Sequence, residues 1–203
     1  NYVKGGGLSA RIYTGKFIYT KEKTSLSEYE TSRYHLNMSG VNGNEDYTYS
    51  NYFIGRNEFE GFGTRQLLMK EGAFKVHTDL LSEKIGKTDN WLGAINFTST
   101  IPKNINPLEI FPIKIPLKIF FDFGTYSNAW EQNPPTEKLL YDAGFQISLL
   151  KDIVNIYFPV VYSKSYKDYF KSVLNEKIFM KNISFSIDLQ KITLKNLFPE
   201  IAF

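Results

Sequence analysis

The sequence predicts an all-β chain, and within that class an antiparallel transmembrane β-barrel, or the C-terminal part of one, with one short helix. Three observations predict this fold. Apolar and polar residues alternate in several short segments, which is the pattern of strands with one apolar face. Several segments run nine to eleven residues, the length with which a tilted strand crosses a bilayer. Tyrosine and tryptophan gather at the segment ends, where membrane barrels carry aromatic girdles.

Composition limits the alternatives. The chain has 203 residues and begins at Asn1 without an initiator methionine, so we expect one domain over residues 1–203 that is a piece of a longer protein. Cysteine is absent, which excludes a disulfide-stapled fold and a thiolate metal site. The net charge of +3, with 22% charged residues, is too balanced for binding of nucleic acid through its phosphates. No apolar run reaches the roughly 18–20 residues of a transmembrane helix.

Five strands are predicted in the first hundred residues. Residues 10–19, 46–54 and 91–100 are rich in β-branched and aromatic side chains but alternate irregularly. Residues 33–40 and 74–80 alternate cleanly, with apolar side chains at even positions and charged or polar ones at odd positions. Glycine, asparagine and aspartate between these segments indicate turns.

Four strands and one helix are predicted in the remainder, which gives about nine strands in all. Residues 115–123 and 139–149 place a nearly continuous apolar set on odd positions, and residues 183–189 do the same over a shorter length. Residues 155–163 are β-rich with weaker alternation. Residues 165–174 place aromatic and aliphatic side chains three and four apart, which is typical of a short amphipathic helix.

The barrel interpretation assigns two sets of residues. In a membrane barrel the apolar faces meet lipid and the polar faces line the interior, or lumen. The side chains expected to face the lumen are Arg33, His35, Lys75, His77, Asp79, Lys118, Asp122, Asp142 and Asp188. The aromatic side chains expected at the membrane interface are Tyr13, Tyr19, Tyr47, Tyr126, Trp130, Tyr157 and Tyr162.

Two features oppose a closed barrel. Pro116 and Pro159 fall inside predicted strands, and a closed barrel has no free edge where a missing N–H can be hidden. We therefore expect each proline at a bulge or just beyond the strand. Nine strands is also an odd number, whereas bacterial single-chain barrels have even numbers; an incomplete chain removes that objection.

Charged pairs within the predicted strands raise the question of catalysis. His77 and Asp79 share a strand face with Lys75, and Asp122 and Asp142 could face each other across neighbouring strands. A metal or catalytic site needs further ligands nearby, and lumen-facing hydrogen bonds or ion pairs account for the same residues. We expect no catalytic, cofactor-binding or metal-binding residue in this span.

Six stretches, taken together and in order, resemble the C-terminal region of large Gram-negative outer-membrane proteins that carry an N-terminal gluzincin (aminopeptidase-N-like) metallopeptidase domain and end in a β-barrel. The stretches are residues 54–66, 75–81, 86–91, 113–118, 122–126 and 155–163. The resemblance implies a membrane domain. A gluzincin zinc site needs two histidines four residues apart on a helix, and His35 and His77, the two histidines of the chain, do not form one, so the zinc ligands map to no position here.

Three functions are open on the sequence alone. The first is an outer-membrane barrel domain of a Gram-negative bacterium, in contact with lipid and with other outer-membrane proteins or lipoproteins, which anchors or scaffolds an attached soluble domain. The second is a soluble β-sandwich binding module that takes carbohydrate on exposed tyrosines; it predicts that the apolar faces of residues 115–123 and 139–149 are buried in a protein core. The third is the peptidase itself, which requires sequence upstream of Asn1.

Overall fold

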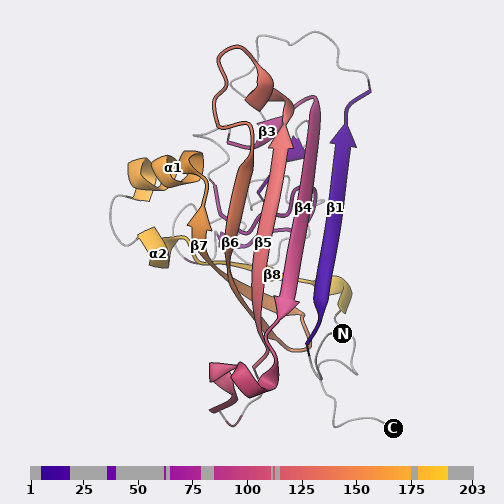
Figure 1. The fold of residues 1–203 in the computed structure, drawn as a ribbon, viewed down its shortest axis with the longest axis vertical. Helices are drawn as coiled ribbons and strands as arrows, with labels where there is room; N and C mark the ends of the chain where they lie inside the picture. Colours follow the sequence, from indigo (N-terminus) through magenta and orange to yellow (C-terminus); the bar gives the residue numbers. More distant parts are fainter. Residues whose placement is uncertain are drawn as a thin grey trace.

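A computed structural model describes residues 6–18, 36–39, 62, 65–78, 85–110, 112, 115–174 and 178–191 of the protein. This part of the chain is mostly β, with an antiparallel sheet that forms a half-barrel and few helices (Figure 1). The coarse fold class predicted from the alternation is therefore confirmed. No helix in the described part of the chain has the length and apolar character needed to cross a membrane.

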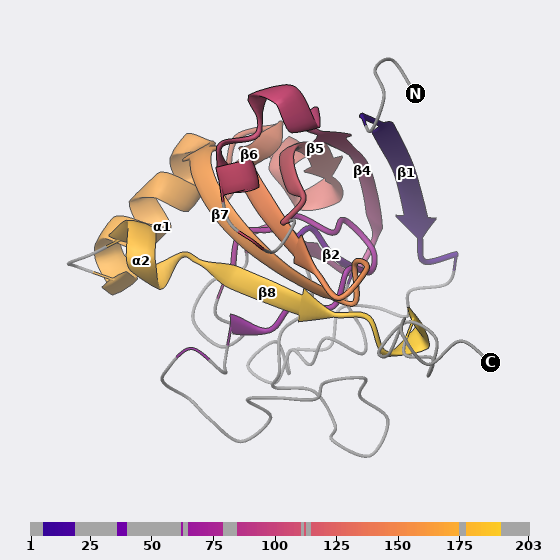
Figure 2. The same ribbon diagram turned by 90° about the horizontal axis from the view of Figure 1, so that it is seen from below.

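Six strands make the main sheet, in the order β1-β4-β5-β6-β7-β8, and each pair is antiparallel. They are β1 (Leu8–Lys16), β4 (Trp91–Thr100), β5 (Leu117–Tyr126), β6 (Leu140–Leu149), β7 (Val154–Tyr162) and β8 (Ser184–Ile187). A second, two-stranded sheet pairs β2 (Leu36–Asn37) with β3 (Lys87–Thr88). Seen along the strands, the main sheet is an arc, and the β2 region lies on its concave side (Figure 2).

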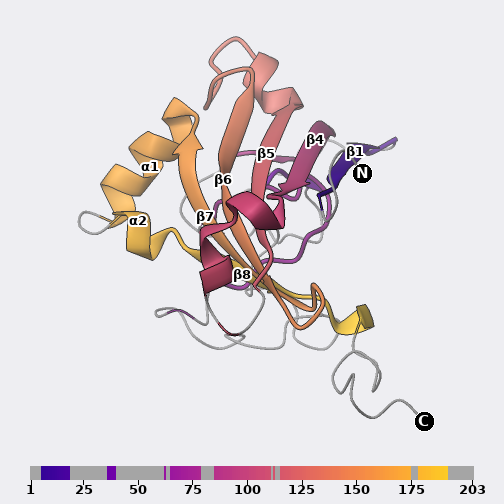
Figure 3. The ribbon, with the colours of Figure 1, turned by 60° about the horizontal axis from the view of Figure 1, so that its bottom comes forward.

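Two α-helices follow β7, where one was predicted. They are α1 (Lys164–Leu174) and α2 (Ile178–Lys181), and both lie beside β7 at the edge of the arc (Figure 3). The predicted helix at residues 165–174 is thus confirmed, whereas α2 is too short to have been seen in a helical periodicity. Four further helices in the described part of the chain are single 3₁₀ turns: η4 (Lys103–Ile105), η5 (Pro107–Ile110), η6 (Ser127–Trp130) and η7 (Leu189–Lys191).

Both prolines that opposed strand pairing are accommodated as expected. Pro159 pairs with Gly144 at a register shift next to Ala143, so it sits at a bulge in the β6–β7 ladder. Pro116 precedes the first residue of β5, and its carbonyl accepts a hydrogen bond from the N–H of Ser148 at 3.3 Å. Neither proline therefore leaves a gap in a regular ladder.

The prediction of a strand at residues 74–80 was wrong for residues 74–78, the part of it that the structure describes. Phe74 makes only an isolated bridge with Ser39, and residues 75–78 have no regular structure. The alternation in this segment has another origin, because Phe74 and Val76 enter an apolar core while Lys75 turns toward the sheet. Of the predicted strand at residues 33–40, the structure describes residues 36–39, which include β2, and the predicted strand at residues 46–54 lies outside the described residues.

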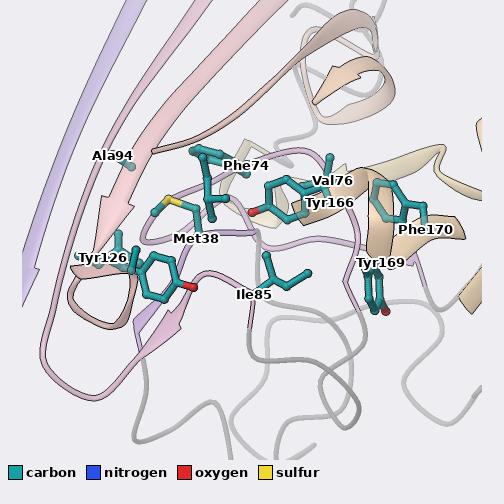
Figure 4. Close-up of a cluster of buried hydrophobic side chains, with 12 residues drawn as sticks. Met38, Phe74, Val76, Ile85, Ala94, Tyr126, Tyr166, Tyr169 and Phe170 are labelled. Atoms are coloured by element: carbon teal, nitrogen blue, oxygen red, sulfur yellow. The ribbon is translucent and has the colours of Figure 1, made fainter. Parts of the chain in front are cut away.

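The apolar core occupies the α1 end of the concave side (Figure 4). Its buried members come from the β2 region, from residues 74–76 and 85, from the adjoining ends of β4, β5 and β6, from η6 and from α1. They are Met38, Phe74, Val76, Ile85, Leu92, Ala94, Tyr126, Ala129, Leu140, Tyr166, Tyr169 and Phe170. Aromatic side chains of α1 therefore close this end of the half-barrel, and most of the buried polar side chains of β6, β7 and β8 lie toward the other end.

Candidate functional site

A buried ion pair joins the interior segment, residues 67–75, to the middle of the sheet. The Nζ atom of Lys75 lies 2.6 Å from Oδ1 and 2.8 Å from Oδ2 of Asp122 in β5. Asn96 of β4 donates from Nδ2 to Oδ1 of Asp122 at 3.0 Å and to the carbonyl of Gly72 at 2.8 Å. Lys75 also lies over the ring of Phe120, with Nζ 5.3 Å from the centroid. A buried charge needs such partners, and these hold Lys75 in one position.

A second carboxylate completes the layer. Asp142 of β6 stands opposite Asp122 in the strand register, as the sequence indicated, and both are fully buried. Oδ2 of Asp142 accepts the backbone N–H of Lys75 at 3.1 Å, and the hydroxyl of Ser184 in β8 donates to the Lys75 carbonyl at 2.6 Å. Three strands thus bind one residue of the interior segment through its side chain, its N–H and its carbonyl.

The backbone of residues 70–74 explains how Lys75 reaches this position. Glu71 and Ala73 adopt left-handed backbone angles, with φ of 49° and 51°, so the chain turns sharply on either side of Gly72. A Cβ atom at Gly72 would overlap the backbone of Met38, and the N–H of Phe74 donates to the Met38 carbonyl at 3.0 Å. The glycine is therefore required for close contact with the β2 region.

Polar groups continue along the concave face below this layer. Asn155 of β7 accepts at Oδ1 from Nε2 of Gln146 at 2.9 Å and from Oγ of Ser148 at 2.7 Å. The hydroxyls of Tyr157 and Ser186 lie 2.7 Å apart. All five residues are buried, so the inner face of β6, β7 and β8 is a hydrogen-bonded surface.

A partly exposed ion pair lies where β6 turns into β7, at the end of the concave side that carries the polar groups. The chain turns from β6 to β7 through Leu150, Lys151 and Asp152, which all have positive φ. Lys118 Nζ lies 2.6 Å from Oδ1 of Asp152. Partial burial raises the pKa of Asp152, but the hydrogen bond and charge of Lys118 outweigh it and leave this pKa below its ordinary value. Asp152 therefore stays ionised to a lower pH than an aspartate with an ordinary pKa.

The convex face of the sheet has the opposite character. In β5 and β6 the odd positions point outward and the even positions point to the concave side, in line with the parity of the sequence. Apolar side chains at the outward positions of five strands, β1, β4, β5, β6 and β7, are more than a third exposed. They are Ile12 (75%), Phe97 (37%), Ile119 (46%), Phe121 (44%), Tyr141 (37%), Phe145 (44%) and Val161 (54%).

The polar residues predicted to face the lumen divide into two groups. Lys75, Asp122 and Asp142 come together in the buried layer, while Lys118 and Asp188 line a cavity on its polar side. His77 is half-buried and directly follows Val76 of the apolar core. Arg33, His35 and Asp79 lie outside the described residues, as do Tyr19 and Tyr47 of the aromatic set.

The remaining aromatic residues differ in position. Tyr126 and Tyr157 are buried on the concave side, which is not the interfacial position predicted, because their parity continues that of the inward residues of β5 and β7. Tyr13 and Tyr162 pack against the apolar core. Trp130 is 54% exposed in η6 and donates from Nε1 to Thr125 at 2.8 Å, so the interfacial position stays open for it.

Several residues of the site were not predicted from the sequence. Arg11, Asn96, Gln146 and Asn155 all lie on the concave side, with the first two beside the Glu71–Gly72 turn. Gln146 shares the parity of Asp142, so the same alternation that picked out Asp142 could have found it. The pattern of residues 10–19 is too irregular to assign Arg11 to a face, and the partners of Asn96 lie far away in the sequence.

These contacts form a charged and polar layer on the concave side of the half-barrel. In the part of the chain that the structure describes, no three His, Cys, Asp or Glu side chains lie close enough to hold a metal ion. Comparisons of the chain with models of protein families, with curated proteins and with solved structures give no match.

Proposed function

We propose that the chain is an outer-membrane β-barrel domain, or part of one, whose convex face lies in lipid and whose concave face lines the lumen. The observation that carries the proposal is the reversed polarity of the sheet. Its outward positions include seven apolar side chains that are more than a third exposed, whereas its inward positions include, next to the apolar core, a buried ion pair and a hydrogen-bonded polar surface. In a soluble β-protein the apolar side of the sheet faces the protein interior, whereas in a membrane barrel it faces outward, toward lipid.

The exposed apolar face is difficult to explain in water. It runs across β1, β4, β5, β6 and β7, and the register places Ile12 opposite Ile95, and Phe121 opposite both Phe97 and Ala143. A contiguous apolar patch of this kind on a soluble protein marks an interaction surface. Lipid covers such a face without any specific partner. The sandwich alternative instead requires a second layer over Ile119, Phe121 and Phe145, which are 46%, 44% and 44% exposed.

The two connections of β7 favour one orientation, and the longer β4–β5 connection, residues 101–116, lies at the same end as its tight turn. Residues 150–153 join β6 to β7 in a tight turn, and the connection from β7 to β8 at the other end carries α1 and α2. Bacterial outer-membrane barrels have short periplasmic turns and longer extracellular loops. In the proposed arrangement the turn at residues 150–153 faces the periplasm, and the aromatic core closed by α1 lies toward the cell exterior.

The role within the parent protein follows from the resemblance of the six sequence stretches. The domain would anchor or scaffold an attached soluble domain, a gluzincin metallopeptidase in the proteins that the chain resembles, at the outer membrane of a Gram-negative bacterium. Its partners would be lipid and other outer-membrane proteins or lipoproteins. No residue of this span is assigned a catalytic role.

Substitution of an outward residue tests the proposal. Phe121 lies near the middle of β5, so Phe121→Arg in lipid vesicles should lower the free energy of unfolding in urea by about 2–4 kcal/mol. Ile105→Arg is the matched control, because Ile105 is 66% exposed in η4, beyond the strand ends, and should change this free energy by less than about 1 kcal/mol. Equal small effects of both variants, with the protein soluble without detergent, would overturn the proposal.

A further inference from the structure

A cavity of about 640 Å³ lies on the polar side of the Lys75 layer. One wall is the interior segment at residues 67–75, and the others come from the inner faces of β1, β4, β5, β6, β7 and β8. Its volume is in the range of sites for small molecules, roughly 300–1,000 Å³. The exposed residues Ser9, Lys70 and Gln190 at its border leave it open to solvent.

The charges around this cavity are unequal. Among the described residues, its lining includes five cationic and two carboxylate side chains. Both carboxylates have a cation beside them, since Asp152 pairs with Lys118 at 2.6 Å and Asp188 with Lys191 at 3.2 Å. Lys75 is paired with Asp122 beneath the cavity wall. The cationic excess therefore rests on Arg11 and Lys70.

Arg11 and Lys70 lie on the same side of the cavity. The Nη1 atom of Arg11 donates to the carbonyl of Glu71 at 2.6 Å and to Oδ1 of Asn96 at 2.9 Å, so the guanidinium is fixed beside the residue that follows Lys70. The carboxylate of Glu71 accepts the backbone N–H of Asn37 and is not part of the cavity lining. A fixed guanidinium is well suited to a carboxylate or phosphate, because its planar donors match two oxygens of the anion.

The cavity also has an apolar part. Leu68 and Ile187 line it, and each follows by two residues the bridge between Gln66 and Phe185. That bridge brings the interior segment alongside β8, so these two side chains form a common surface. We propose that the cavity binds a small organic oxyanion, with its charged group at Arg11 and Lys70 and its apolar part against Leu68 and Ile187.

Binding can be measured on the full chain in detergent micelles through methyl resonances of Leu68 and Ile187. The probes are hexanoate and hexyl phosphate, which share the chain and differ in the oxyanion, with hexanamide as the uncharged probe. At least one anion should shift both methyl resonances and bind about tenfold more tightly than hexanamide, since one charge-assisted hydrogen bond contributes about 1.5–3 kcal/mol. The anion that binds more tightly shows whether the cavity prefers a carboxylate or a phosphate group.

Two variants and one control locate the site. Arg11→Gln should weaken anion binding about tenfold or more, and Lys70→Gln about threefold or more. Lys70 is exposed, so Lys70→Gln tests the site even if Arg11→Gln does not fold. Lys16→Gln removes the same charge at an exposed position of β1 that is not in the cavity lining and should leave binding within about twofold. The proposal would be overturned if hexanamide bound as tightly as the anions, or if anion binding were unchanged in both Lys70→Gln and a folded Arg11→Gln. The proposal does not depend on the position of the sheet in a membrane.

Discussion

Lys75 and Asp122 form an ion pair with 2.6 Å between Nζ and Oδ1, and less than a tenth of either side chain is exposed. The pair connects a segment without regular structure to the middle strand of the half-barrel. It also separates the aromatic core at the α1 end from the polar cavity at the other end. Its removal should therefore affect the whole concave side.

Asp122→Asn should be strongly destabilising. The variant leaves the Lys75 ammonium buried without its carboxylate partner, and breaking one half of a buried pair costs about 3–5 kcal/mol. Urea unfolding, followed by tryptophan fluorescence, measures this loss. The matched control is Lys191→Met, which removes a pair with Asp188 whose side chains are 49% and 36% exposed and should cost less than about 1 kcal/mol.

The double variant Lys75→Met/Asp122→Asn separates the pair from its surroundings. If the two side chains stabilise the protein through each other, the double variant loses less free energy of unfolding than the sum of the two single variants. Additive losses would show that Lys75 and Asp122 act independently and would contradict the assignment of a single buried pair.

Gly72→Ala should destabilise the protein through a different contact. A Cβ at this position would overlap the Met38 backbone, and overpacking of this kind costs about 1–3 kcal/mol. Gly93→Ala is the control, because a Cβ at Gly93 meets nothing within 4 Å. Thermal unfolding of both variants checks the prediction, and a Gly72→Ala protein as stable as Gly93→Ala would rule out the close approach.

The first turn of α1 should be sensitive to acid. Burial raises the pKa of Glu137, but hydrogen bonds from Ser165, which include its N–H at 3.1 Å from Oε2, outweigh burial and lower it below the ordinary value. A lowered pKa contributes stability above the pKa of the unfolded chain, about 4.3, and that stability is lost as the pH falls through the folded value. Glu137→Gln should remove this part of the acid loss.

Hydrogen exchange of the α1 amides between pH 6 and pH 3 tests the acid effect. Protection in the unmodified protein should exceed that in Glu137→Gln at pH 6, and the two should converge toward pH 3. A constant difference across this range would show that Glu137 does not stabilise α1 through its charge.

The sequence predicted the strands best where alternation was complete. The strand predicted at residues 139–149 corresponds to β6, which begins one residue later, at Leu140. Phe145 points outward and Asp142 points inward, as expected. Alternation is a local property of a strand with two different faces, so it can be read without knowledge of the partners. The opposition of Asp122 and Asp142 was also expected, because both lie at the inward parity of neighbouring strands.

The interior segment could not be predicted in the same way. Lys75 alternates with Phe74 and Val76 as a strand residue would, yet it pairs with a carboxylate 47 positions away and its backbone is held by Asp142 and Ser184. These tertiary contacts replace a strand ladder, and nothing local in the sequence distinguishes the two. The cavity was missed for the same reason, since Arg11 and Lys118 come to line one cavity only after β1 and β5 enter one sheet.

Spin labels on adjacent residues test the central claim, that the convex face lies in lipid. The chain has no cysteine, so single cysteines at Phe97, Phe121 and Phe145 label only the outward positions, and Thr98 in the cavity lining gives an inward control. In lipid vesicles, dissolved oxygen should relax the three outward labels more than a water-soluble nickel chelate does, and the chelate should dominate at Thr98. Outward labels that are relaxed mainly by the chelate, or shielded from both agents, would contradict a membrane-facing sheet.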